Sequence, residues 1–499
     1  MRINVSVITA VIGTAVTVAL VFGVNAQTTT SPYYSEGAVI APLPVAGVPP
    51  LPEWRLQPIG KRPVMGSVNT GPGLDGPNVY DLSARGYVEE EYFIEGHGNV
   101  YAADGTGVVE ADVPYVSRIL VRRPANKNAF SGNIIIEPSR DVNEWTTTWP
   151  AAAPRMIDHG DVFVALTMAK ANLADFFFGY DADRYGSLSI PHEGLRWDLM
   201  AQVGALMRSS EGPLGELGFL DHAKTLKGGL KVISTGTSLT GGMQSTFIDD
   251  GHHARARRAD GGPVMDGYLI LVSGRPQNLP ADAAVISIVA EGDFGRSAER
   301  LKALRAPDQD GPVRFRWYEM AGVSHANWGD QSQFTPAFQL IGAKERTTIR
   351  CAAPVSDVAV KNDFVTAALA NLEAWIREGS TPPPGRMLTL DVNNEVKRDT
   401  HGNAVGGLRP YWVEVPISRV FPVSEEVRES AAIAATGGLC GMFAYEAPLP
   451  NSVLHQMYED SAEYLSKVEG HLKTLVAARY LLPEDAERQL QRARLNRIP

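Results

Sequence analysis

The sequence predicts an α/β fold, in which a mostly parallel central sheet is flanked by helices. Short runs rich in β-branched residues alternate with stretches of helical periodicity through the middle of the chain, which is typical of this class. At 499 residues the chain is also long enough to bury a large core. The expected strands are 116–121, 133–137, 161–166, 230–234, 266–272, 285–290 and 313–318.

The expected helices follow the spacing of apolar residues. They span 196–209, 239–250, 296–305, 363–378 and about 452–480, with a short one after Pro483. The fourth is the best defined, and its apolar face is made of Leu369, Leu372, Trp375 and Ile376. Asp363 can cap its start, and Gly379 followed by Pro382 ends it.

The charge and the cysteine count exclude several classes of function. The chain has 46 Lys and Arg against 56 Asp and Glu, a net charge of −10. Nucleic acids and anionic membrane surfaces both require a basic face, so neither is an expected partner. Two cysteines are too few for a structural zinc site, and we expect no metal and no cofactor.

The N-terminus predicts export. Arg2 is followed by an apolar stretch from Val5 to Val24, and small residues precede a break after Ala26, as in a secretory signal peptide. The alternative is an anchor that stays uncleaved. We expect cleavage, a secreted or periplasmic protein, and no membrane association after it. In an oxidising compartment Cys351 and Cys440 can pair as a disulfide, and the alternative is a catalytic cysteine.

The remaining chain divides into an arm, one enlarged domain and an extension. Residues 27–63 are rich in proline and predict an arm that lies on the surface or moves freely. The catalytic domain is expected at 64–384. Within it, 167–229 is longer than a crossover requires and is a candidate cap over a ligand crevice. Its aromatic residues could equally be buried as core. Residues 385–499 form a C-terminal extension packed on the domain.

A candidate nucleophile follows the strand at 230–234. Ser238 lies where this strand runs into a helical stretch, which is the position of the nucleophile elbow. The strand and helix of an elbow approach closely, so residues two positions away on either side must be small. Gly236 meets this condition, whereas Thr240 replaces the usual second glycine. The motif alone is therefore weak.

Two later strand ends carry the groups that such a serine needs. Glu291 and Asp293 follow the strand at 285–290, and His325 follows the strand at 313–318. The chain order is serine, acid, histidine, and ligands bind outside the carboxyl ends of parallel strands. We expect His325 to act as the general base and Asp293 to orient it, with Glu291 as the alternative acid.

The oxyanion hole needs two N–H donors. The first is expected from the backbone of Leu239, and the second from the loop after 133–137, where Ser139 or Arg140 could supply it. Other histidines compete as functional candidates. His252 and His253 lack a third metal ligand at a familiar spacing, and we expect them in a surface cluster.

Several segments resemble the exported bacterial α/β hydrolase domain proteins. The resemblance spans about Glu90 to Leu482 and is carried by Tyr115 to Pro124 (YVSRILVRRP), Asp183 to Leu188 (DRYGSL), the Ser238 elbow, Ala321 to His325 (AGVSH), Leu372 to Pro384 (LEAWIREGSTPPP), Gly402-Asn403-Ala404 and Gly406-Gly407. It implies an α/β-hydrolase fold with Ser238 and His325 as catalytic residues. Members often have Ser-Gln-Ser-Gly at the elbow and an Asn-rich oxyanion loop, and this chain departs at both.

The expected function is that of an exported serine hydrolase, which acts on a small-molecule carboxylic ester through an acyl-enzyme at Ser238. Peptidase and acyltransferase activities use the same triad and stay open as alternatives. A further alternative is an inactive α/β-hydrolase scaffold that binds a ligand, which Thr240 and the altered oxyanion loop suggest. The sequence indicates no oligomeric state.

Overall fold

A computed structural model describes residues 33–58, 64–67, 81–140, 144, 146–326, 351, 353–357, 361–425 and 439–498. The predicted signal peptide and its cleavage site lie outside these residues. No helix in the described part of the chain is long and apolar enough to cross a membrane.

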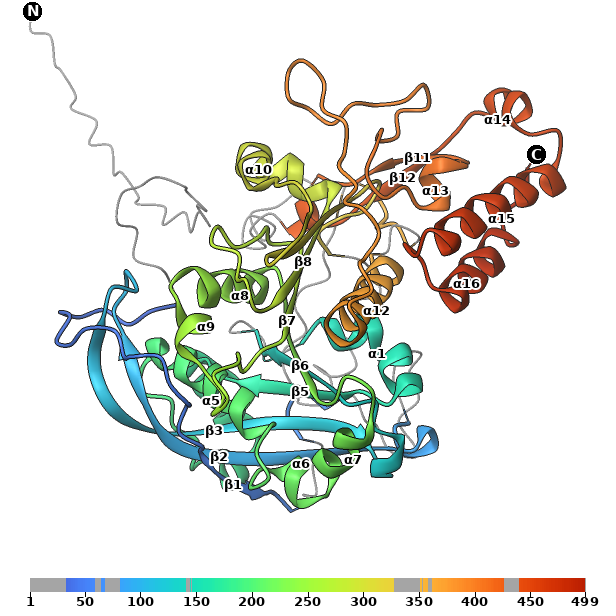
Figure 1. Ribbon diagram of the computed structural model, residues 1–499. Helices are drawn as coiled ribbons and strands as arrows, with labels where there is room; N and C mark the ends of the chain where they lie inside the picture. The colour runs from blue at the N-terminus through green and yellow to red at the C-terminus, as the bar shows by residue number, and fades with distance from the viewer. Residues whose placement is uncertain are drawn as a thin grey trace, which may run out of the picture.

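Ten strands of the described chain form one twisted sheet in the order β1-β2-β3-β5-β4-β6-β7-β8-β10-β9 (Figure 1). Its strands are β1 (Glu53–Leu56), β2 (Tyr87–Tyr101), β3 (Val108–Pro124), β4 (Asn133–Pro138), β5 (Val162–Thr167), β6 (Lys231–Thr237), β7 (Gly267–Leu271), β8 (Ala284–Ala290), β9 (Gln309–Asp310) and β10 (Arg314–Met320). Strands β5, β4, β6, β7, β8 and β10 are mutually parallel, and the other neighbours pair antiparallel. The mostly parallel α/β sheet is thus confirmed, and each of the seven predicted strands is present.

Strand β2 was not predicted, because its sequence is rich in charge. Glu89, Glu90 and Glu91 follow one another in it. Each pairs with an arginine of the neighbouring strand β3: Glu89 with Arg122 at 2.8 Å, Glu90 with Arg123 at 2.8 Å and Glu91 with Arg118 at 2.6 Å. Arginine and carboxylate on adjacent strands compensate each other's charge, so a polar run can occupy the interior of the sheet.

Helices cover both faces of the sheet. They are α1 (Thr148–His159), α2 (Lys170–Asn172), α3 (Phe178–Tyr180), α4 (Ala182–Tyr185), α5 (Arg196–Leu206), α6 (Pro213–Glu216), α7 (Phe219–Thr225), α8 (Leu239–Asp249), α9 (His252–Arg255), α10 (Glu291–Leu304), α12 (Asn362–Glu378), α13 (Tyr411–Glu414), α14 (Asn451–Met457), α15 (Ser461–Ala477) and α16 (Pro483–Ala493). Helices α1 and α12 pack together against one face, and α8, α9 and α5 lie together on the other (Figure 1).

The predicted helix at 452–480 is wrong as a single element. The structure divides it into α14 and α15, because the Asp460 side chain accepts hydrogen bonds from the backbone N–H groups of Ala462 and Glu463 and begins a new helix. The predicted helix at 296–305 in turn begins earlier, at Glu291.

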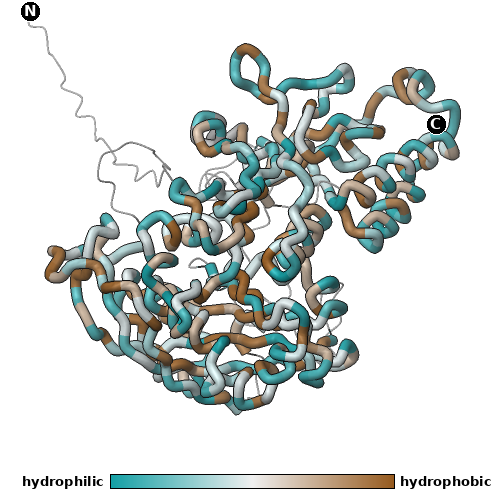
Figure 2. The backbone as a smooth tube through the Cα atoms, viewed as in Figure 1, coloured by the Kyte–Doolittle hydropathy of each residue, from teal (hydrophilic) through white to brown (hydrophobic). Residues whose placement is uncertain are grey.

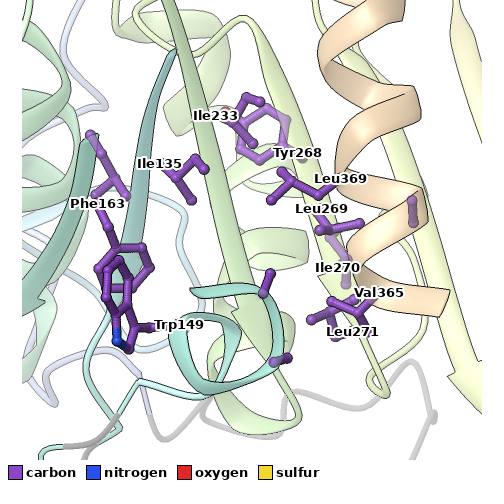
Figure 3. Close-up of a cluster of buried hydrophobic side chains, with 14 of the residues drawn as sticks. Ile135, Trp149, Phe163, Ile233, Tyr268, Leu269, Ile270, Leu271, Val365 and Leu369 are labelled. Atoms are coloured by element: carbon purple, nitrogen blue, oxygen red, sulfur yellow. The ribbon is translucent and has the colours of Figure 1, made fainter. Parts of the chain in front are cut away.

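The hydrophobic core lies where the parallel strands meet α1 and α12. Figure 3 shows Ile135, Phe163 and Ile233 from the sheet facing Trp149 of α1 and Leu369 of α12, and all five are fully buried. Figure 2 shows the same pattern along the chain, with hydrophobic colour on the central strands and hydrophilic colour on the outer helices and loops. Burial of these apolar faces holds the helices on the sheet.

The described part of the arm, 33–58, lies along the hairpin of β2 and β3. Ser35 forms a bridge with Ala102, Ala41 forms one with Val108, and β1 pairs with β2. The candidate cap at 167–229 divides into two parts. Its second half contains α5, which contacts β2 of the sheet. In its first half Phe177 is fully buried as core, whereas Phe178 is exposed; a cap function stays a prediction.

The C-terminal extension is joined to the sheet along β10, the strand next to the short edge strand β9. Tyr318 forms a bridge with Arg386 and Met320 forms one with Leu408. Beyond these contacts the extension contains its own short sheet of β11 (Ser418–Phe421) and β12 (Tyr445–Pro448) and the helices α13 to α16 (Figure 1).

Candidate active site

Ser238 occupies a strained turn between β6 and α8. Its backbone has φ of 57° and ψ of −113°, a conformation that L-residues rarely adopt. The turn projects the side chain away from both elements at the carboxyl edge of the sheet, and Ser238 is half-buried there. This is the geometry of the nucleophile elbow that the strand–serine–helix sequence predicts.

The neighbours of Ser238 let the strand and the helix approach. A Cβ on Gly236 would lie 2.4 Å from the carbonyl oxygen of Thr240, and one on Gly241 would lie 2.8 Å from Cβ of Ser273. Thr240 itself is fully buried. Its hydroxyl accepts a hydrogen bond from the Thr237 N–H at 2.9 Å and donates to the Thr237 carbonyl at 3.1 Å. The departure from glycine therefore adds two hydrogen bonds across the elbow.

The structure brings Ser238, His325 and Asp293 together. His325 Nε2 lies 2.8 Å from Ser238 Oγ, and His325 Nδ1 lies 2.6 Å from Asp293 Oδ1. The second oxygen of Asp293 accepts the Ala290 N–H at 3.0 Å, which fixes the carboxylate. With its proton on Nδ1, the imidazole donates to Asp293 and accepts the Ser238 hydroxyl proton, so the arrangement can deprotonate the serine.

Glu291, the alternative acid, does not contact His325. Its Oε2 accepts the Gly322 N–H at 2.6 Å, and its Oε1 forms an ion pair with Arg398. The side chain is 1% exposed. Burial raises the pKa of this carboxyl, and the Arg398 guanidinium opposes that rise. Of the two candidate acids, only Asp293 lies against the imidazole.

The structure gives a different outcome for each predicted oxyanion donor. Leu239 is the first residue of α8, so its N–H has no carbonyl one turn earlier to bond and lies beside the nucleophile. The prediction for Ser139 is wrong, because its N–H donates to the Leu166 carbonyl at 2.8 Å and continues the pairing of β4 with β5. Arg140 stays as the predicted second donor. Its carbonyl accepts from Asn172 Nδ2 at 2.8 Å, which places the first part of 167–229 beside this loop.

Two buried carboxylates hold the loop that contains Arg140. Glu137, at the end of β4, accepts the N–H groups of Thr147 and Thr148 at 2.9 Å and so caps the start of α1. Burial raises the pKa of Glu137 to about 7, against the effect of these hydrogen bonds. Glu144 has φ of 52° and is 3% exposed, and its carboxylate binds Asn172 Nδ2 at 2.5 Å.

A disulfide lies close to the histidine loop. Cys351 and Cys440 are bonded to each other, as the sequence analysis expected, and no cysteine is left free. Cys440 belongs to a short 3₁₀ segment whose Met442 carbonyl accepts the Ala326 N–H at 2.8 Å. Ala326 directly follows His325, so the disulfide fixes a segment that supports the candidate base.

His252 and His253 are buried, so their prediction as a surface cluster is wrong. Each is 3% exposed. His252 stacks on Trp197 with ring centroids 5.1 Å apart, and His253 lies 2.8 Å from the Tyr268 hydroxyl. Burial lowers the pKa of His252 well below its ordinary value, which keeps this ring neutral. Both side chains are part of the packing beneath α8.

A group of possible metal ligands exists, at the opposite edge of the sheet. His159, Asp161 and Glu373 have ligand atoms within 4.8 Å of one another. Arg155 forms ion pairs with both carboxylates, at 3.1 Å with Asp161, so its guanidinium already supplies the positive charge. Asp161 directly precedes β5 and therefore lies at the end of the sheet away from Ser238. We regard this cluster as structural.

A mostly parallel sheet with a serine elbow, followed in chain order by an acid and a histidine that meet it, defines the α/β-hydrolase class. The model of the family described as alpha/beta hydrolase domain matches residues 55–491, and this chain belongs to that family. No curated protein matches the chain.

The solved structures that match this chain are only distantly similar to it. A feruloyl esterase module from Clostridium thermocellum is 11% identical and aligns over 58% of this chain and 97% of its own, with a TM-score of 0.27. A putative dienelactone hydrolase from Klebsiella pneumoniae is 12% identical over 50% and 99%, with a TM-score of 0.22. A thermostable esterase from Pseudomonas putida is 12% identical over 53% and 82%, with a TM-score of 0.26. At these values the likeness says nothing about substrate or mechanism.

Three supporting residues were missed at the sequence level. Glu137 is directly before the predicted oxyanion loop, and a carboxylate at the end of a buried strand is a signal that could have indicated it. Glu144 and Arg398 carry no such signal, because their partners are distant in the chain.

We expect the Thr240 hydroxyl to support the elbow. Thr240→Val keeps the shape but leaves the buried Thr237 N–H unpaired, which costs about 1–3 kcal/mol. Urea unfolding should show this loss and a serine-reactive probe should label the variant more slowly. Thr240→Ser, the matched control, keeps both hydrogen bonds and should label at the wild-type rate. A valine variant as stable and as reactive as the wild type would contradict this role.

Proposed function

We propose that this protein is a serine hydrolase that cleaves carboxylic esters through an acyl-enzyme on Ser238. The observation that carries the proposal is the continuous hydrogen-bonded contact from Ser238 Oγ to His325 Nε2, at 2.8 Å, and from His325 Nδ1 to Asp293, at 2.6 Å. Ser238 follows β6, Asp293 lies in the first turn of α10 directly after β8, and His325 follows β10, so their convergence depends on the whole fold.

In the proposed mechanism His325 takes the proton of Ser238 as Oγ attacks the ester carbonyl. Asp293 holds the imidazole in the tautomer that can accept this proton and stabilises the imidazolium that results. The developing oxyanion is bound by the Leu239 N–H and by a second donor, for which we propose Arg140. His325 then protonates the leaving alcohol. Water attacks the acyl-enzyme with His325 as the general base, and the acid is released as Ser238 regains its proton.

The elbow also bears on the inactive-scaffold alternative. Thr240 was one reason to consider it, because the residue departs from the usual glycine. Its hydroxyl bonds with Thr237 and the strained Ser238 backbone support an elbow that keeps a reactive geometry. A protein that only binds ligands has no need to hold a serine in so costly a conformation.

We also propose that the chain is exported and cleaved after Ala26. The disulfide between Cys351 and Cys440 supports an oxidising compartment, where such bonds persist. We expect N-terminal sequencing of the mature protein from its host to begin at Gln27 and the protein to fractionate outside the cytoplasm. A mature chain that begins at Met1 in the membrane fraction would favour the anchor instead.

Labelling tests the nucleophile. We expect a fluorophosphonate probe to label the purified protein and Ser238→Ala to abolish labelling, together with about 10⁶ of kcat on short-chain aryl esters. The alanine variant should remain folded, because the side chain is half-buried and small. Labelling that persists in this variant would refute the assignment. A wild type that neither labels nor hydrolyses any ester would favour the binding scaffold, and a panel with amides and acceptor alcohols would separate peptidase and acyltransferase activities.

A comparison of two amide variants tests the acid. Asp293→Asn should lower kcat by about 10⁴, because asparagine cannot hold the imidazole in the required tautomer. Glu291→Gln should cost much less, since its amide oxygen can still accept the Gly322 N–H. The measurement is kcat per active site, counted by probe titration. A larger loss in Glu291→Gln would mean that the acid has been assigned to the wrong carboxylate.

A further inference from the structure

The loop that carries His325 is held mainly by segments far away in the chain. It follows β10, and Gly322 within it has φ of 66°. The Ala321 N–H donates to the Leu408 carbonyl at 2.9 Å, and the Ala326 N–H donates to the Met442 carbonyl at 2.8 Å. Leu408 and Met442 both belong to the C-terminal extension. The backbone on both sides of His325 is therefore hydrogen-bonded to the extension.

The extension also packs against the loop closely. A Cβ on Gly322 would lie 2.3 Å from Cγ2 of Val413, a residue of α13. A Cβ on Gly292, between Glu291 and Asp293, would lie 2.8 Å from the Pro422 carbonyl oxygen. The first turn of α10, which carries Asp293, and the loop that carries His325 thus both contact the extension through glycines.

Glu291, the first residue of α10, connects the start of this helix to the loop that carries His325. It is two residues before Asp293, and its carboxylate accepts the Gly322 N–H at 2.6 Å, three residues before His325. A second bond joins the same two segments, because the Gly292 N–H donates to the Val323 carbonyl at 3.0 Å. The Glu291 carboxylate can accept from Gly322 only while its side chain is held in place, and at 1% exposure it has almost no solvent to stabilise its charge.

Arg398, a residue of the extension, compensates the charge of the Glu291 carboxylate. Its guanidinium forms an ion pair with Glu291, and its side chain is 36% exposed. The surrounding hairpin is well held, since Arg398 forms a bridge with Ala404 and Asn403 binds the backbone at both Ser418 and Val420. Gly402-Asn403-Ala404, which the sequence resemblance singled out, is thus the turn that presents Arg398.

We propose that Arg398 is a positioning residue for the hydrolase reaction. Through Glu291 it fixes Gly322 and therefore sets where His325 Nε2 lies relative to Ser238 Oγ. Arg398 contacts neither Ser238, His325 nor Asp293 in the structure, so its effect is indirect. This inference rests on the proposed function. If Arg398 has this role, the C-terminal extension contributes to the geometry of the proposed active site.

The test is steady-state kinetics on Arg398→Gln with a short-chain aryl ester. Each preparation is titrated with a fluorophosphonate, so that kcat refers to competent sites alone. We expect kcat per titrated site to fall about 10–100-fold while KM changes less than about 2-fold, because a small displacement of a reacting group is costly to the chemical step. Arg398→Lys should recover most of the rate, since it keeps the charge beside Glu291.

Two further variants test whether the effect is specific to the contact between Arg398 and Glu291. Lys397→Gln removes the same charge from the neighbouring exposed residue, for which no side-chain partner is described, and should leave kcat unchanged. Glu291→Gln combined with Arg398→Gln should be no slower than the slower single variant, because both act through one contact.

Three outcomes would overturn the proposal. Arg398→Gln could have an unchanged kcat per titrated site and only fewer sites, which is the result for a purely structural ion pair. Its effect could fall on KM alone, or the two substitutions could be additive. Failure of the proposed function is distinguishable from all of these, because then the wild type itself would neither label nor hydrolyse the ester.

Discussion

The candidate active site depends on the backbone conformation of Ser238. A positive φ at a residue with a side chain is costly, and it persists only where the surroundings leave no alternative. Here β6 and α8 approach so closely that Gly236 and Gly241 cannot carry a Cβ, and Thr240 closes the turn with its own hydroxyl. The same turn places the first N–H of α8 beside Oγ. The proposed nucleophile and the first proposed oxyanion donor are therefore both positioned by this one turn.

The second requirement is to hold two loops in place, the predicted oxyanion loop after β4 and the loop that carries His325. A buried carboxylate contributes to holding each of them. Glu137 caps α1 beside the predicted oxyanion loop, and Glu291 joins the first turn of α10, which carries Asp293, to the loop of His325. A charged acceptor binds an N–H more strongly than a neutral one does, but its burial must be offset. At Glu291 the Arg398 guanidinium offsets the effect of burial. At Glu137 hydrogen bonds from backbone N–H groups oppose the effect of burial, which raises the pKa of this carboxyl to about 7.

Sequence reasoning works best where the determining residues are local. The parallel strands and the elbow could be predicted because each is encoded within about ten residues, and the meeting of Ser238, Asp293 and His325 followed from the rule that strand ends share an edge. Strand β2 could not be predicted in this way. Its three glutamates are compatible with a strand only because arginines about thirty residues later face them, and a local pattern contains no such information.

The supporting residues of the site were hidden for the same reason. Arg398 lies more than one hundred residues from Glu291 and belongs to a segment that looks irregular, with turns at Gly402 and Gly406. Directly after the second turn the chain packs on β10, since a Cβ on Gly407 would lie 2.6 Å from the Glu319 carbonyl oxygen. A glycine that makes the extension look like a loose appendage thus lets it approach the sheet. An extension attached this closely to β10, and to the loop that follows it, cannot be separated from the geometry of His325, so the proposed catalytic unit includes the extension as well as the sheet.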